Sequence, residues 1–308
     1  MTGSYSRKPL RSYQGVSQSP AQGGFSVLFG VPFVLAGGFI LLIAGKVIPV
    51  SPGEVKAPMW VLGAVGASFA LAGAVLMIKG AIDLSRARRI EKQKSLNPRE
   101  PWCWDYPWNP AGIQENKQKK VFRQFLAAGF LLIFLVPLNW WAWGLPEAPG
   151  MVRVIVSLFD FAALLVLGYA FYLLFQYRKY GNGRLRFQSF PFFLGEKARM
   201  VLEGLPEGLD HLHLTLRFIE EAYETRYRGR DRSTQVVFYL RYLEERTLNG
   251  ASLPRGGELA LEWDLPPDKE FVSRLGERPA WYWELTARAE TPGIDYEARF
   301  FLPVYARP

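Results

Sequence analysis

Four long apolar stretches constrain the fold of this chain more than any other feature of its sequence. They begin at Phe25, Met59, Phe125 and Val152. A helix needs roughly 20 apolar residues to cross the ~30 Å hydrocarbon core of a bilayer, and it satisfies its backbone hydrogen bonds internally. The sequence therefore predicts a membrane α-helical domain of four spans within residues 25–183.

Short connections join these stretches in pairs. The segments SPGEVKAP and LPEAPG separate the first stretch from the second and the third from the fourth. Because such short connections join antiparallel neighbours, we expect two helical hairpins. In the second stretch Gly66, Ala70 and Ala74 recur at every fourth position. Small residues at this spacing form a face where a neighbouring helix can approach closely.

Basic residues lie on one side of the predicted spans. They are Arg7, Lys8 and Arg11 before the first span, eleven Lys and Arg within 79–123, and Arg178 and Lys179 after the fourth. Segments rich in Lys and Arg stay in the cytoplasm. We therefore expect a multi-pass membrane protein with both termini and a helical hairpin at 79–123 in the cytoplasm. Residues 1–24 would form a disordered basic tail.

The charge is distributed unevenly between the two halves of the chain. Residues 1–183 contain 19 Lys and Arg against 8 Asp and Glu, whereas residues 184–308 contain 18 against 20. Because the basic excess lies beside apolar runs, it favours an anionic membrane surface over nucleic acid as its partner. The expected partner is the lipid bilayer, and no nucleic acid is expected.

The hydrophobic pattern changes from helical to alternating at Leu185. The segments that alternate are RLRFQSFP, EKARMVLEGL, HLHLTLRF, QVVFYLRYLE, ELALEW, WYWELTARAE and DYEARFFLPVY. Alternation places one set of side chains inward, and the segments are separated by Gly/Pro turns such as LPEGLD and TPGID. Residues 184–308 therefore predict a soluble, all-β antiparallel sandwich of about seven strands, cytoplasmic like the hairpin.

The order GGELALEWDLPPD followed by WYWELTARAETPGIDYEARFFLPVY resembles the second half of an arrestin-like or Ig-like sandwich. With PWCWDYPW ahead of the third span, the whole chain is similar to uncharacterised bacterial inner-membrane proteins that combine four helices with such a C-terminal domain. The resemblance implies a fold and a bacterial inner membrane. It provides no catalytic residues.

Asp160 is the one acid well inside a predicted span. An ionisable residue in this position is costly, so it is by default a candidate proton or cation site. Arg153, two turns earlier on the same helix face, and Asn139 of the third span are the other candidate residues of this polar site. The alternative is a structural hydrogen bond from a protonated Asp160 to Asn139 or to a tryptophan of NWWAW. Both interpretations remain open from the sequence.

No pattern in the sequence carries catalytic chemistry. His211 and His213 share the polar face of one strand, and no Cys, His or carboxylate is spaced to complete a metal site with them. Cys103, the only cysteine, is expected to be a small buried residue among tryptophans. We therefore expect no enzyme, no catalytic residue, no cofactor and no metal.

The stretch PWCWDYPWNP at 101–110 places Trp102, Trp104 and Trp108 between two basic runs. The runs predict helical stalks, one continuing the second span and one starting at Pro110. The tryptophans would then dock on the sandwich or, if the stalks bend, lie on anionic lipid. Docking on the sandwich is the favoured hypothesis.

These patterns favour a non-catalytic interaction or scaffold protein that acts through its cytoplasmic β-sandwich. Its partner would be an unknown protein or a second copy of the chain. The alternative is a small transport or proton-coupled membrane protein in which Asp160 is the working group.

Overall fold

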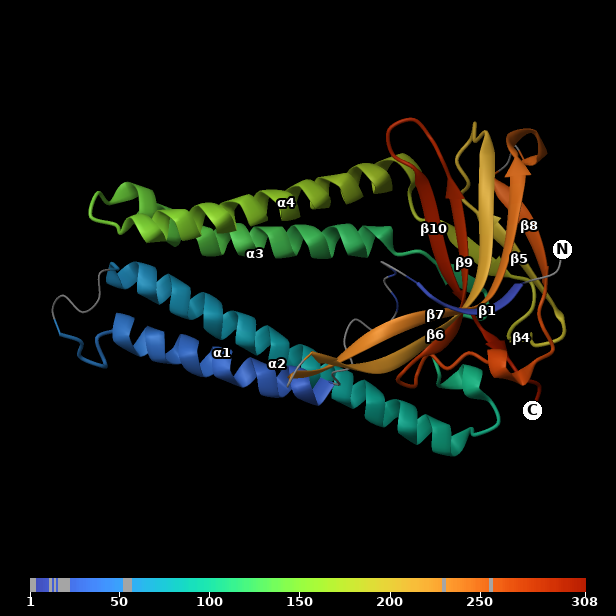
Figure 1. The fold of residues 1–308 in the computed structure, drawn as a ribbon, viewed down its shortest axis with the longest axis horizontal. Helices are drawn as coiled ribbons and strands as arrows, with labels where there is room; N and C mark the ends of the chain where they lie inside the picture. The colour runs from blue at the N-terminus through green and yellow to red at the C-terminus, as the bar shows by residue number, and fades with distance from the viewer. Residues whose placement is uncertain are drawn as a thin grey trace. The chain divides into compact units, whose positions relative to one another are not determined.

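The computed structural model describes residues 4–10, 13, 15, 23–51, 57–228, 231–254 and 257–308 (Figure 1). The chain forms two compact units. One, the helical unit, contains Ala21–Arg86 and Gln118–Phe175. The other, the β unit, contains Met1–Pro20, Ala87–Lys117 and Gln176–Pro308. The boundary differs from the expected one, because the segment around residue 100 belongs with the strands.

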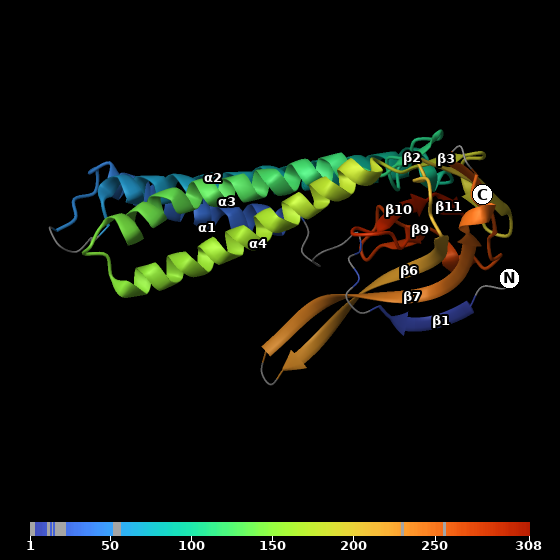
Figure 2. The ribbon, with the colours of Figure 1, turned by 90° about the horizontal axis from the view of Figure 1, so that it is seen from above.

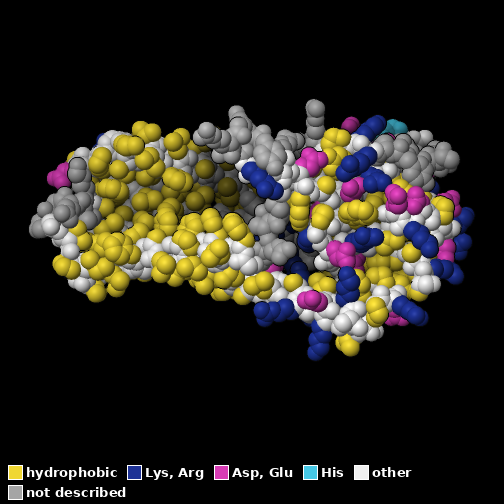
Figure 3. Space-filling view, turned by 60° about the horizontal axis from the view of Figure 1, so that its bottom comes forward, with side chains coloured by type: hydrophobic (Ala, Val, Ile, Leu, Met, Phe, Trp, Pro, Cys, Tyr) yellow, Lys and Arg dark blue, Asp and Glu magenta, His cyan; other side chains and the backbone are white. Residues whose placement is uncertain are grey.

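Four helices carry the predicted spans. They are α1 (Gly23–Ala44), α2 (Met59–Leu96), α3 (Lys117–Gly144) and α4 (Gly150–Tyr180). All four are long enough and apolar enough to cross a membrane, which confirms the prediction. Their outward side chains are apolar, as at Leu28, Ile133 and Met151, and Figure 3 shows hydrophobic side chains over most of the visible helix surface. Such a surface suits lipid as its solvent.

Glycines set the contact between α1 and α2. A Cβ atom on Gly37 would lie 2.4 Å from the backbone nitrogen of Ala70 and 2.6 Å from the carbonyl oxygen of Gly66. Gly30 and Gly73 meet in the same way. A Cβ atom on either glycine would lie 2.7 Å from the carbonyl oxygen of the other. The predicted small-residue face is therefore right at Gly66 and Ala70. Gly73 continues it in the structure, since a seven-residue repeat keeps facing the partner helix.

Replacing Gly37 by Leu should separate α1 from α2, because the new side chain has no room against the α2 backbone. We expect a loss of about 1–3 kcal/mol of stability. Gly38→Leu is the matched control, since no atom lies within 4 Å of its Cβ position. Thermal unfolding in detergent measures both variants. Equal midpoints for the two would contradict the close helix contact.

The stalk that continues the second span is confirmed, because α2 runs without a break to Leu96. The helix expected from Pro110 is wrong. Residues 112–114 form a short strand, β2 (Gly112–Gln114), which pairs with residues 184–186, and α3 begins at Lys117. Gly112 has φ +136° and its Cβ would lie 2.2 Å from the Leu185 carbonyl oxygen, so only glycine fits this strand.

Two antiparallel sheets form the β unit. Their strands are β1 (Ser4–Pro9), β2, β3 (Arg184–Phe187), β5 (Lys197–Glu203), β6 (His211–Arg228), β7 (Asp231–Asn249), β8 (Glu258–Asp264), β9 (Trp281–Ala289) and β10 (Tyr296–Leu302). One sheet has the order β1-β7-β6-β9-β10 and the other the order β2-β3-β5-β8. A short parallel pair, β4 (Phe192–Phe193) with β11 (Val304–Tyr305), lies beside them.

The main core lies between the two sheets. Alternate residues of β6, β9 and β10 meet those of β3, β5 and β8, as Leu216, Trp283 and Phe300 do with Met200 and Trp263. The seven strands expected from alternation, β3 and β5 to β10, are all present, which confirms an antiparallel two-layer β fold. The four additional strands have six residues or fewer, too short to show a period.

One predicted face is only half right. We expected Val236, Phe238, Leu240 and Tyr242 of β7 to point into one core. Tyr242 lies in the main core, but Phe238 packs on the opposite face of the sheet. The pairing of β6 with β7 shifts by one residue between Phe218 and Ile219, and such a bulge exchanges the two faces of a strand.

The expectation of a disordered tail over 1–24 is wrong for residues 4–9. They form β1, which pairs antiparallel with residues 239–243 of β7, and Leu10 N–H donates to the Phe238 carbonyl at 2.8 Å. Arg7 also pairs with Glu220 at 3.3 Å. The sequence SYSRKP has no apolar alternation of its own, so its strand depends on the free edge that β7 offers. Arg11 lies outside the described residues.

Candidate functional site

The tryptophan-rich stretch forms a tight loop between α2 and β2. A 3₁₀ turn, η1 (Pro101–Cys103), starts it, and the Pro101 carbonyl accepts hydrogen bonds from the backbone N–H groups of Trp104 and Asp105 at 3.1 and 2.8 Å. Proline suits the first position of such a turn because its φ angle is already close to the helical value. We call residues 101–109 the aromatic loop.

The aromatic loop covers the second face of the five-stranded sheet. On this outer face, Ile219, Tyr282, Leu275 and Ala280 form a small buried cluster. The residues that pack on this outer cluster are Tyr106 and Trp108 of the aromatic loop, Leu10 and Tyr13 of the N-terminal segment, Phe238 and Phe301. The sheet is therefore buried on both faces at this end.

Asp105 and Tyr305 form the polar centre of this contact. Trp108 Nε1 donates to the Tyr305 hydroxyl at 2.8 Å, and that hydroxyl donates to Asp105 Oδ2 at 2.9 Å. The backbone N–H of Gly276 donates to Asp105 Oδ1 at 2.6 Å. Asp105 is only 3% exposed, and this burial raises the pKa of its carboxyl above the ordinary value, although the hydrogen bonds oppose the shift.

The three tryptophans do not share one environment. The Trp102 ring lies 5.9 Å from the rings of Phe193 and Tyr305, so it packs on the strands as Trp108 does. Trp104 is buried instead at the end of α2, where its Nε1 donates to the Asn97 carbonyl at 3.0 Å. Of the two alternatives considered for the loop, the structure has the one in which it docks on the sandwich.

The expectation that Cys103 is buried is wrong. Its side chain is exposed, with Sγ 3.5 Å from Glu100 Oε2. The turn directs the neighbouring Trp102 and Trp104 side chains into contacts with protein, and it leaves the Cys103 side chain between them facing solvent.

Removing the Trp108 side chain should loosen the aromatic loop, because it deletes both the ring on the outer cluster and the bond to Tyr305. Trp108→Ala is expected to cost about 3 kcal/mol, whereas Trp108→Phe, which keeps a ring, should cost about 1 kcal/mol. Hydrogen exchange at residues 275–282 measures the loss of protection. Cys103→Ala is the control, and protection equal to it in Trp108→Ala would contradict the proposed contact.

A second buried carboxylate lies on the same outer face. Glu284 is 0% exposed and accepts hydrogen bonds from Arg217 Nε at 2.8 Å and from the Tyr13 hydroxyl at 2.5 Å. Arg299 Nε lies 3.7 Å from Glu284 Oε2, and the Arg299 guanidinium lies over the Tyr13 ring. Burial and the nearby carboxylate raise the pKa of Tyr13, so it remains a neutral donor.

Sequence reasoning did not find Glu284, Tyr13, Asp105 or Tyr305. Alternation along β9 places Glu284 on the solvent side, and only the N-terminal segment folding across that face buries it. The one available signal was WYWEL itself, since a strand with large aromatic residues at successive positions indicates burial on both faces.

In the helical unit, Asn139 and Asp160 form a direct pair. Asn139 Nδ2 donates to Asp160 Oδ1 at 2.7 Å and also lies 3.3 Å from the Leu135 carbonyl of its own helix. Arg153 does not join them. Its guanidinium donates to the Ala142 carbonyl at 2.9 Å and stacks over Trp143, so it closes the C-terminal end of α3.

Replacing Asp160 separates a structural role from a chemical one. Asp160→Asn keeps an acceptor for Asn139 and should keep the unfolding midpoint, whereas Asp160→Leu should lose about 1 kcal/mol, as interhelical hydrogen bonds in membranes do. Thermal unfolding in detergent measures both, with Ser157→Ala as the control. An equal loss in Asp160→Asn and Asp160→Leu would show that the carboxylate itself is needed.

The remaining candidates show no convergent chemistry. His211 and His213 are exposed on β6 and bond Asn249 and Thr247 across the sheet at 3.1 and 3.0 Å. No group of three or more metal-ligating side chains occurs in the described part of the chain.

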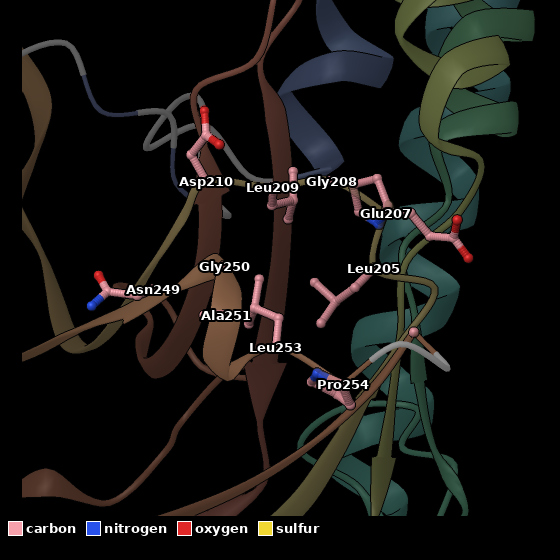
Figure 4. Close-up of a pocket in the computed structure, with 12 residues that line it drawn as sticks. Leu205, Glu207, Gly208, Leu209, Asp210, Asn249, Gly250, Ala251, Leu253 and Pro254 are labelled. Atoms are coloured by element: carbon pink, nitrogen blue, oxygen red, sulfur yellow. The ribbon is translucent and has the colours of Figure 1, made fainter.

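A depression of about 650 Å³ lies at the ends of β5 and β7 (Figure 4). Leu205, Leu209 and Leu253 point into it, while the carboxylates of Glu207 and Asp210 point away from these leucines. A ligand site needs polar groups that converge, so this depression lacks the arrangement of an active site.

The two longest strands continue beyond the sheet. β6 pairs with β9 over 213–220 and β7 pairs with β1 over 239–243. Among the described strands, residues 222–228 and 231–237 therefore have sheet pairing with each other alone. Figure 2 shows this end of β6 and β7 projecting as a two-stranded ribbon. We call residues 222–237 the ribbon. Its described part spans more than 20 Å at about 3.3 Å per residue.

No protein-family model and no curated protein matches the chain. A solved structure similar to part of it is the crystal structure of Spo0M, a sporulation control protein from Bacillus subtilis. The similarity has 14% identity and a TM-score of 0.23, and it covers 40% of this chain and 49% of Spo0M. The chain thus aligns with about half the length of that protein.

Proposed function

We propose that this chain is a non-catalytic interaction protein of the cell inner membrane, held there by its four helices. Its β unit lies in the cytoplasm and binds a protein partner, or a second copy of the chain, through the ribbon. The observation that carries this proposal is that the outer edges of β6 and β7 along the ribbon pair with no other described strand.

Free strand edges favour recognition by strand addition. An edge presents a row of N–H and C=O groups that an extended segment of another chain can pair with. Proteins usually shorten or cover such edges, and β1 does cover β7 at 239–243. The ribbon lacks this cover in the part of the chain that the structure describes. A two-stranded ribbon is also marginally stable alone, so a partner strand would stabilise it.

The buried carboxylates support a non-catalytic role because each has a structural partner. Glu221 accepts the backbone N–H of Ala280 at 3.1 Å, and Glu244 accepts the Tyr242 hydroxyl at 3.0 Å. Asp105 and Glu284 are held as described above. None is left to act as a general acid or base on a substrate.

The proposed orientation and family likeness have separate support. The basic residues of 79–123 favour the cytoplasmic side by the positive-inside rule. The order of β8, β9 and β10, with the short β11 after Pro303, supports an arrestin-like sandwich of the bacterial kind that the sequence resembles. The alternative function, transport through Asp160, has weaker support, since Asn139 already satisfies that carboxylate.

Removing the ribbon tests the proposal. Glu221 pairs with Phe238, so residues 222–237 can be replaced by an Asn-Gly turn that closes the same hairpin. Affinity capture from native membranes, followed by mass spectrometry, should recover a protein with the full chain that the shortened chain loses. An intermolecular crosslink between two copies would identify self-association in the same experiment.

Two controls make the result specific. Hydrogen exchange across β9 and β10 should be unchanged in the shortened chain, which shows that the sandwich stays folded. Asp160→Asn should capture the same partner as the full chain. The proposal fails when the shortened chain captures the same proteins in equal yield, or when the full chain captures none above a membrane control.

A further inference from the structure

Cations in the β unit and cations at the helix ends have different environments. Most arginines and lysines of strands β3 to β10 face a carboxylate, as in Arg186 with Glu203 and Lys197 with Glu262, both at 2.6 Å. In the helical unit, the cations just beyond the apolar stretches of α2 and α3 are Lys79, Arg86, Lys119, Lys120 and Arg123, and Asp83 is the one acid among them. All five are exposed, and none has an ion-pair partner among the residues that the structure describes.

These five cations lie at the same end of two antiparallel helices. Trp60 of α2 packs edge-to-face on Trp140 of α3 with ring centroids 4.8 Å apart, and the ring centroids of Phe69 and Phe134 are 6.4 Å apart. Ten residues further along α2, or about 15 Å, this antiparallel register brings Lys79 to about the level of Arg123. The two helices therefore present one basic zone, which belongs entirely to the helical unit.

The basic zone begins where the apolar part of each helix ends. Residues 59–78 of α2 and 125–144 of α3 contain no charged side chain. Each stretch spans about 30 Å at 1.5 Å per residue, the thickness of a hydrocarbon core. Lys79 follows directly, and Arg123, Lys120 and Lys119 lie within about 10 Å of the core edge, at the depth of phospholipid phosphates.

We propose that Lys79 and Arg86 of α2, together with Lys119, Lys120 and Arg123 of α3, bind the phosphate groups of an anionic phospholipid. The lipid supplies negative charge to cations that form no ion pair within the described residues, even though Asp83 lies on the same helix as Lys79 and Arg86. Lys117 marks the limit of the zone, because it is buried and donates to the Glu297 carbonyl at 2.7 Å. The inference rests on the helices crossing a bilayer and is independent of the ribbon.

Lipid binding to the purified full chain tests the proposal. Native mass spectrometry in nonionic detergent counts bound phosphatidylglycerol and phosphatidylcholine during a titration. Three variants are compared with the unmodified chain. Lys119→Gln/Lys120→Gln/Arg123→Gln removes charge from the zone, and Lys119→Arg/Lys120→Arg/Arg123→Lys retains it. Lys197→Gln/Arg199→Gln/Arg288→Gln removes three exposed cations of the β unit and is the matched control.

The unmodified chain should bind phosphatidylglycerol at least about tenfold more tightly than phosphatidylcholine, and the Gln variant of the zone should lose about tenfold or more. The charge-retaining variant and the β-unit control should bind as the unmodified chain does. The proposal is overturned by equal binding of the two lipids, by unchanged binding in the Gln variant, or by displacement of phosphatidylglycerol with inorganic phosphate. The comparison of lipids on the unmodified chain decides the question even where the Gln variant fails to fold.

Discussion

The hydrogen bonds among Asp105, Trp108 and Tyr305 are the interaction on which the rest of the β unit depends. They join positions about 200 residues apart in the chain and fix the aromatic loop on the outer face of the five-stranded sheet. If the loop came away from the sheet, Ile219 and Tyr282 would lose the Tyr106 and Trp108 rings that pack on them, and Asp105 would lose its donors Gly276 and Tyr305. A buried carboxylate without hydrogen bonds costs more than the same group in solvent, so the contact is cooperative.

The β unit is assembled from three separate parts of the chain, and this contact joins two of them. Each part adjoins a helix end, and each is held to the strands by polar contacts. Lys117 at the start of α3 donates to the Glu297 carbonyl, and Lys179 near the end of α4 donates to the Pro292 carbonyl at 2.9 Å. The N-terminal segment ahead of α1 is held through Tyr13 and Glu284. All of these contacts lie within the β unit, whose least supported element is the ribbon.

The distribution of charge differs between the two units. In the sandwich, carboxylates pair with most cations, so its surface is nearly neutral and its buried acids serve the fold. Five cations of the helical unit form no ion pair within the described residues, although Asp83 lies within one turn of Lys79 and Arg86 on α2. Unpaired cations at this density repel one another, and this repulsion is the basis for the lipid phosphates proposed above.

The sequence by itself determined the four apolar helices, the continuous α2, and seven of the strands with most of their core faces. These features follow from local period and length, which each segment carries alone. Only the tertiary structure decided that residues 4–9 form a strand, that Gly112–Gln114 pair with β3, and that Trp104 packs apart from Trp102 and Trp108. It also decided that Glu284 is buried and Cys103 exposed. Such outcomes depend on which edge or face another segment covers, and burial by a distant segment leaves no period in the local sequence.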